Sequence, residues 1–135
     1  MEPTLYIIMR SDLPDLNPGK GMAQAAHAQA DFDARIAKIA KDIDFPGHSE
    51  LMIDYSDWSE DRSFGRTIVL SATKEKIREI VVEGTLAGTT IDPTYPWRNY
   101  YGEMFVTEEV TCGWIFVCDV FESDLDRVKD LPLHK

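Results

Sequence analysis

Apolar residues follow two different spacings along this chain. Some stretches are apolar or β-branched at nearly every position, which is typical of strands buried inside a sheet. These stretches cover residues 5–9, 66–71, 89–91 and 109–119. Elsewhere apolar residues recur every three or four positions, which predicts amphipathic helices over residues 18–41, 48–61 and 73–83. Residues 124–130 fit one or two further helical turns, and residues 92–106 fit neither spacing and are expected to be irregular.

Local signals mark where two of these helices begin. Asn17 suits the N-cap of the first helix, and Pro18 suits its first position because proline has no backbone N–H to bond. Thr73 suits the N-cap of the helix that precedes Gly84. Alanines at helical spacing along residues 18–41 predict a face of small side chains, which lets a helix lie close against a sheet.

The alternation of strands and helices predicts an α/β fold. A long helical connection separates the first two strands, and such a crossover places them side by side in parallel. The link from the third strand to the fourth contains no helix, so the last strand is expected to be antiparallel. We therefore predict a three-layer α/β/α sandwich with a four-stranded mixed sheet, formed by a single domain over residues 1–135.

Composition adds limits on the kind of protein. The chain is 44% hydrophobic and 28% charged, a globular balance. No apolar run approaches the about 20 residues that span a bilayer, and the N-terminus does not resemble a signal peptide. Cys112 and Cys118 lie in one apolar stretch, which predicts reduced, buried thiols and a cytoplasmic location. A net charge of -10 argues against general nucleic-acid binding but leaves a local basic site open.

Candidate chemistry gathers at the start of the first helix. Lys20, Gln24 and His27 share one helix face, which begins where the first strand ends. A lysine beside exposed backbone amides can hold an anion, although a solvent-exposed lysine on a glycine-rich turn explains the pattern equally well. The segment is not a Walker A loop, because Lys20 is followed by Gly21. His27 could pair with Asp31 as a base and its orienter, but a packed core histidine is the commoner case.

Two further features follow the third predicted strand. Asp92 lies at its carboxyl end, where a carboxylate could orient or deprotonate water, or could cap an Asx turn. The aromatic loop that follows, with Arg98, could stack a terminal base or ribose; it could equally form a local core or a dimer contact. Its aromatic residues are Tyr95, Trp97, Tyr100, Tyr101 and Phe105.

Taken together, these motifs resemble the type 2 peptidyl-tRNA hydrolase family. The family's pattern R-x-D-L, then G-K-x-x-A-Q-x-x-H-A, is matched from Arg10 to Leu13 and from Gly19 to Ala28. Weaker parallels are Trp58 before a glycine and a strand, Asp92, Thr111 and the closing residues 131–133. The family's D-A-G-x-T stretch is altered after Asp92, so the resemblance is to a divergent member, for which a viral origin is one candidate.

The resemblance implies a fold and an activity. The fold is the mixed sandwich described above, and the activity is hydrolysis of the ester between a peptide, or N-blocked amino acid, and the 3′ end of tRNA. It implies catalytic roles for Lys20, Asp92 and Thr111. Substrate binding would fall to Arg10, Gln24, His27, Thr94 and Arg98, with His27 also supporting helix packing.

The resemblance implies no metal and no organic cofactor. The expected partner is the 3′ acceptor end of peptidyl-tRNA, with no membrane contact and with a homodimer left open. A non-catalytic tRNA- or protein-binding module that keeps the fold is the main alternative. A hydrolase of an unrelated ester or amide is a third interpretation of the same residues.

Overall fold

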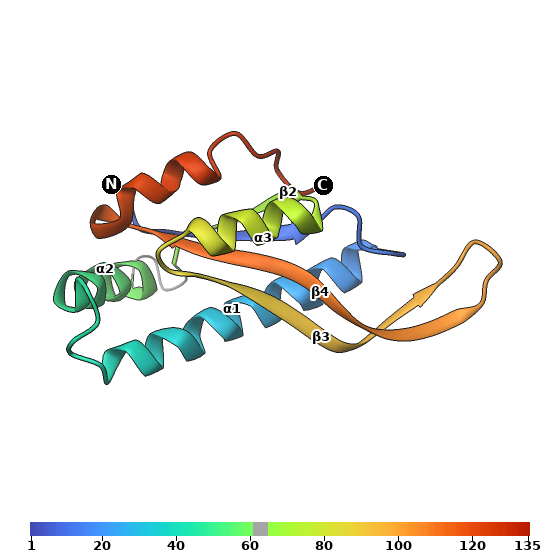
Figure 1. Ribbon diagram of the computed structural model, residues 1–135, viewed down its shortest axis with the longest axis horizontal. Helices are drawn as coiled ribbons and strands as arrows, with labels where there is room; N and C mark the ends of the chain where they lie inside the picture. The colour runs from blue at the N-terminus through green and yellow to red at the C-terminus, as the bar shows by residue number, and fades with distance from the viewer. Residues whose placement is uncertain (61–64) are drawn as a thin grey trace.

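The computed structural model describes residues 1–60 and 65–135 (Figure 1). Within these ranges four strands form one mixed sheet in the order β2-β1-β4-β3. β1 (Thr4–Arg10) is parallel to β2 (Thr67–Ala72), and β4 (Met104–Val117) is antiparallel to both β1 and β3 (Ala87–Arg98). The predicted α/β class, with a four-stranded mixed sheet and an antiparallel last strand, is therefore confirmed.

The longest helix, α1 (Pro18–Ala40), begins as the sequence predicts. The side chain of Asn17 accepts a hydrogen bond from the backbone N–H of Lys20 at 2.9 Å, and Pro18 follows the cap. One face of α1 buries Ala28, Phe32 and Ile36 against the sheet. α2 (His48–Glu60) packs against the same hydrophobic cluster through its buried residues. Residue 61, the expected end of this helix, lies outside the described residues.

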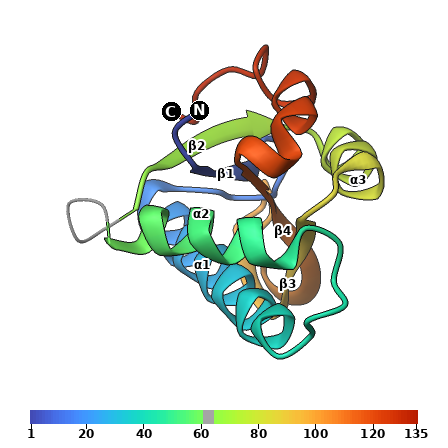
Figure 2. The ribbon, with the colours of Figure 1, turned by 90° about the vertical axis from the view of Figure 1, so that its left-hand side faces the viewer.

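A second hydrophobic cluster lies on the other face of the sheet. It contains Ile77 and Ile80 of α3 (Lys74–Glu83), which Thr73 caps by accepting from the backbone N–H of Lys76 at 3.3 Å. The 3-10 helix η2 (Asp119–Arg127) follows β4, earlier than the turns expected at 124–130. Figure 2 shows α1 and α2 on one side of the sheet and α3 on the other. Both faces of β1 are buried as its apolar run predicts.

The link between β3 and β4 contradicts the sequence prediction. Residues 92–106 were expected to be irregular, but β3 continues to Arg98 and β4 begins at Met104. The two strands form a long hairpin that extends beyond the rest of the molecule (Figure 1). Cross-strand pairing explains the extension: Trp97 and Phe105 are register partners and stack with ring centroids 4.7 Å apart. Prolines are tolerated because β3 is an edge strand.

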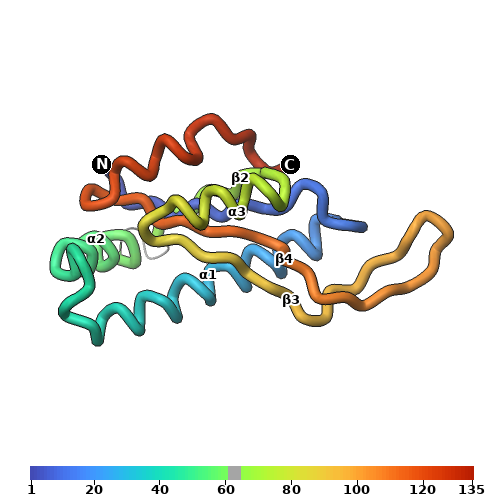
Figure 3. Tube along the Cα trace, viewed as in Figure 1, coloured from blue at the N-terminus to red at the C-terminus, as the bar shows by residue number. Residues whose placement is uncertain are grey.

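The chain ends beside the other edge of the sheet. The backbone N–H of Ser71 in β2 donates to the carbonyl of Pro132 at 2.9 Å, and Leu70 forms an isolated bridge with Leu133. Figure 3 shows the C-terminus next to β2. In the described ranges, no helix is both long and apolar enough to cross a bilayer.

The two cysteines are free and buried, as expected. Burial raises the pKa of Cys112 and of Cys118 to about 12. Both groups therefore stay as neutral thiols at physiological pH, and neither serves as a thiolate nucleophile.

Candidate active site

A chain of hydrogen bonds joins three elements at one place. Gln24 of α1 is buried, and its Nε2 donates to Asp92 Oδ2 of β3 at 2.8 Å. Thr111 of β4 donates its hydroxyl to Gln24 Oε1, also at 2.8 Å. The two bonds use both ends of the amide, which fixes its orientation. α1 thus ties together the residues that sequence reasoning had singled out separately.

Thr111 has a different position from the one its expected role requires. Its side chain is fully buried, and its hydroxyl also lies 3.5 Å from the carbonyl oxygen of Thr90. A buried hydroxyl cannot reach a substrate at the surface. Thr111 therefore positions Gln24 through its hydrogen bond to Oε1.

Asp92 lies inside β3 rather than at its end. The register of β3 against β4 shifts between Asp92 and Tyr95, and this irregularity turns the carboxylate toward two donors. Besides the bond from Gln24, Asp92 Oδ1 accepts from the backbone N–H of Thr94 at 2.9 Å. The Asx-type turn that the sequence left open therefore forms through Thr94, because Pro93 has no backbone N–H, while the other oxygen meets Gln24.

The environment of Asp92 favours its charged form. Partial burial alone would raise the pKa of this carboxyl group. The hydrogen bonds from Thr94 and Gln24, with the nearby His27, outweigh that effect and hold the pKa of Asp92 below its ordinary value. At neutral pH the group is therefore a carboxylate, able to accept a hydrogen bond from water.

Lys20 lies one turn before Gln24, on the predicted face. Its ammonium group contacts Asp15, with Nζ 3.1 Å from the Oδ2 carboxylate oxygen and 3.2 Å from the backbone carbonyl. Nζ also lies 5.3 Å from the ring centroid of Tyr95, a cation–π distance. Tyr95 is fully buried and donates its hydroxyl to the carbonyl of Pro14 at 2.7 Å.

Asp15 belongs to the site and was missed in the sequence. Its backbone has a φ of 54°, which non-glycine residues seldom adopt. The backbone N–H of Arg98 and the ammonium of Lys20 lower the pKa of its carboxyl group. Asp15 thus links Lys20 to Arg98, the last residue of β3 before the hairpin loop. The signal that could have identified it is an aspartate in a proline-rich turn, a residue type that tolerates positive φ.

His27 is exposed, so the packed core histidine that we considered the commoner case is wrong. Its Nδ1 lies 3.3 Å from Gln24 Oε1. Asp31 is not its partner, because the Asp31 carboxylate accepts from the Thr90 hydroxyl at 2.8 Å. His27 therefore borders the Gln24–Asp92 pair, at the open side of the site.

The two candidate arginines are placed differently. Arg10 is mostly buried and donates to Glu109 at 2.8 Å and to Asp12 at 2.9 Å. Glu109 is the register partner of Asp92, so Arg10 lies close to the site with its charge already balanced. Arg98 donates its Nη1 to the carbonyl of Gly102 at 3.0 Å, which places it on the hairpin.

No family model matches this chain, and no curated protein matches it. Its function is therefore inferred from the geometry of the site and from the motif resemblance from Arg10 to Ala28.

We expect the free energy of unfolding to fall as the solution is acidified below about pH 5. The pKa values of Asp12, Asp92 and Glu109 all lie below their ordinary values in the folded protein. A carboxyl group with a depressed pKa stabilises the fold above its unfolded pKa. That contribution is lost as the pH falls through the folded pKa. Urea unfolding at a series of pH values measures the effect.

Glu109→Gln should remove part of this acid sensitivity, since the Arg10 guanidinium lowers the pKa of Glu109. At neutral pH the variant should lose about 1–3 kcal/mol, the range for a charge-assisted hydrogen bond. Glu108→Gln is the matched control, because Glu108 is exposed and no ion pair joins it within the described ranges. An equal loss of stability on acidification in both variants would contradict the assignment of this sensitivity to the Arg10–Glu109 pair.

Proposed function

We propose that this protein hydrolyses the ester bond between a peptide, or N-blocked amino acid, and the 3′ end of tRNA. The observation that carries the proposal is the Thr111–Gln24–Asp92 hydrogen-bond chain, which holds a carboxylate next to the N-terminal turns of α1. The motif resemblance from Gly19 to Ala28 supplies the substrate class. The geometry supports hydrolysis in general, because it combines a fixed carboxylate, a cation and helix amides.

Asp92 acts on the attacking water. Its ionised oxygen accepts a hydrogen bond from the water and turns the lone pair of the water toward the ester carbonyl carbon. The new carbon–oxygen bond forms and the bond to the ribose oxygen breaks. The proton that the water gives up passes to that oxygen, which leaves as the 3′ hydroxyl. Because the pKa of Asp92 is depressed, the carboxylate orients water better than it abstracts a proton. Gln24 keeps the carboxylate in place through its amide.

Lys20 supplies positive charge to the substrate. The ammonium stabilises either the 3′-terminal phosphate or the negative charge that develops on the ester oxygen. Its partner, Asp15, is 41% exposed at the side chain, and solvent screens exposed ion pairs so that they contribute little. A phosphate can therefore displace Asp15 at small cost.

The hairpin offers aromatic surface to the tRNA end. Tyr100 and Tyr101 at its tip are 97% and 83% exposed, so their rings are open to stacking with bases. Contact of this kind does not need a basic face, which suits a chain with a net charge of -10. Arg98, the last residue of β3 before this tip, adds a positive charge at the same end of the hairpin.

The decisive experiment compares two substrates. Purified protein is incubated with N-acetyl-aminoacyl-tRNA and with free aminoacyl-tRNA, and the released acid is measured. We expect release from the N-blocked substrate and little from the free one. Tight tRNA binding without release from either would favour the non-catalytic binding module, and release from both at equal rates would favour an unspecific ester hydrolase.

Lys20→Ala should lower the hydrolysis rate by roughly 10²–10³-fold, the range for losing one group that stabilises an oxyanion. The free energy of unfolding should change by less than about 1 kcal/mol, because the Asp15 pair is partly exposed. Lys41→Ala is the control, since Lys41 is an exposed lysine at the other end of α1. Full activity per folded molecule in Lys20→Ala would exclude Lys20 from the site.

A further inference from the structure

A cavity lies along the carboxyl-terminal half of α1. It has a volume of about 420 Å³, which is within the range of small-molecule sites. Its walls come from α1, from the first residues of β3, from Val81 of α3 and from Trp114 of β4. Arg35 of α1, one of its lining residues, lies three turns beyond Gln24, about 16 Å along the helix axis. The cavity is therefore separate from the site around Asp92.

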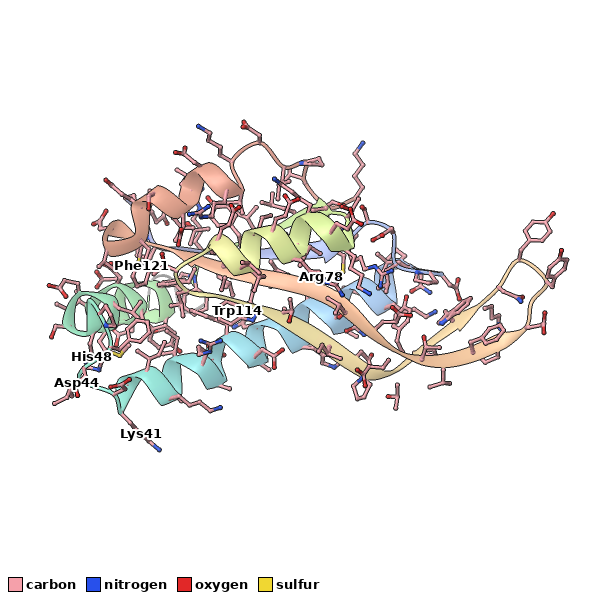
Figure 4. The ribbon with its side chains drawn as sticks, viewed as in Figure 1. Lys41, Asp44, His48, Arg78, Trp114 and Phe121 are labelled. Atoms are coloured by element: carbon pink, nitrogen blue, oxygen red, sulfur yellow. The ribbon has the colours of Figure 1, made fainter. Side chains whose placement is uncertain are left out.

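Trp114 brings an unpaired donor to this cavity. The residue is 2% exposed, and in residues 1–60 and 65–135 its Nε1 is the one buried side-chain polar atom that lacks a hydrogen-bond partner. Trp58 and Trp97, by contrast, donate their Nε1 to Arg66 and Thr107. Buried donors are nearly always paired, so an unpaired one calls for an acceptor. Figure 4 labels Trp114 at the sheet, between α3 and α1.

Gly88 packs against the ring edge that carries this donor. Gly88 is the register partner of Trp114, and both line the cavity. A Cβ atom at this glycine would lie 2.9 Å from Trp114 Nε1 and 2.7 Å from the nearest ring carbon. Any larger residue would therefore collide with the indole. Glycine keeps the N–H edge of the ring uncovered by a side chain from β3.

Two positively charged side chains of α1 line the cavity. Arg35 and Lys38 are exposed, lie one helical turn apart and form no ion pair with any described residue. Asp31 is the acidic residue of the wall, and its Oδ2 oxygen is engaged by the Thr90 hydroxyl. The cavity therefore carries an excess of positive charge, although the chain as a whole is acidic.

We propose that this cavity binds a small molecule with an oxyanion group, either a carboxylate or a phosphate. The oxyanion lies between Arg35 and Lys38, and an acceptor atom of the ligand takes the hydrogen bond from Trp114 Nε1. Ala34, Ala87 and the indole ring form the apolar part of the wall. The proposal is independent of the ester hydrolysis proposed above, because none of these residues belongs to that site.

The test observes the indole N–H directly. In a proton–nitrogen correlation spectrum of the full chain, the three tryptophan indole signals are followed during titration with inorganic phosphate and, separately, with acetate. Sodium chloride at matched ionic strength is the blank. The Trp114 signal should move downfield with one or both anions. The signals of Trp58 and Trp97 should stay in place, because both N–H groups are already paired.

Variants on α1 complete the test. Arg35→Gln with Lys38→Gln should weaken the binding at least about tenfold, the loss expected for one charge-assisted hydrogen bond. Lys41→Gln removes a charge from the end of the same helix, outside the cavity, and should bind normally (Figure 4). The anion that moves the Trp114 signal identifies the ligand as a phosphate or a carboxylate. No selective movement with either anion, or equal movement in the double variant, would overturn the proposal.

Discussion

Asp92→Asn should lower turnover by roughly 10²–10⁴-fold, the contribution of a positioned general base or water-orienting group. The substitution keeps the shape of the side chain and removes its negative charge. In the native protein the two carboxylate oxygens accept from Thr94 and from Gln24. An amide offers one acceptor, so one of these bonds is lost. The free energy of unfolding should therefore fall by about 1 kcal/mol. Release of acid from N-acetyl-aminoacyl-tRNA, measured per folded molecule, reports the effect.

Measuring tRNA affinity together with turnover separates two roles of Asp92, the orientation of water and the stabilisation of its own turn. The tRNA affinity of Asp92→Asn should stay close to that of the native protein, because the substituted group acts on water. Asp12→Asn is a suitable control. Like Asp92, Asp12 accepts one side-chain and one backbone hydrogen bond, here from Arg10 and Lys74, but it lies outside the Gln24 chain. Near-normal turnover in Asp92→Asn would mean that the carboxylate only stabilises the turn through Thr94. It would then favour the non-catalytic binding module.

Phe32→Ala should destabilise the protein by about 3–5 kcal/mol, the usual cost of removing a buried phenyl ring. Phe32 is fully buried between α1 and the sheet. Its ring lies 5.0–5.9 Å from the centroids of four other aromatic rings, those of Tyr55, Trp58, Trp114 and Phe116. Packing this dense relaxes little after truncation, so a cavity remains. Urea unfolding at neutral pH measures the loss.

Phe105→Ala provides the matched control for the core. Phe105 is 38% exposed and stacks on Trp97 in the hairpin. Its removal should lower the free energy of unfolding by about 0.5–1.5 kcal/mol. This is what an aromatic pair contributes in addition to the burial of its surface. A cost for Phe105→Ala that equals that of Phe32→Ala would mean that the hairpin is part of the cooperative core, contrary to its extended position (Figure 1).

Several elements could be predicted because their signals are local. Asn17 and Thr73 cap their helices as expected, since a cap depends on residues two or three positions apart. The apolar run of β1 predicted burial on both faces, and Ile7 and Ile8 lie in the two different hydrophobic clusters. The shared face of Lys20 and Gln24 also follows from helical geometry alone.

The hairpin could not be predicted from the same kind of pattern. Residues 92–98 contain two prolines and an aspartate, which argue against a strand when the segment is considered alone. What makes them extended is pairing across the hairpin with residues of β4, as Trp97 pairs with Phe105. The edge position of β3 then removes the penalty for proline, and this position is a property of the whole sheet.

The sequence by itself determined the class of the fold, the starts of α1 and α3, and the face that carries Lys20 and Gln24. The caps and the shared face depend on neighbours within one or two turns. Tertiary structure alone decided that Asp92 meets Gln24, that Thr111 is buried behind both, and that Asp15 meets the backbone N–H of Arg98. It also decided that Trp114 keeps an unpaired N–H. Hydrogen bonds between residues 68 or 87 positions apart exist only after the sheet has brought the strands together, so no local pattern encodes them.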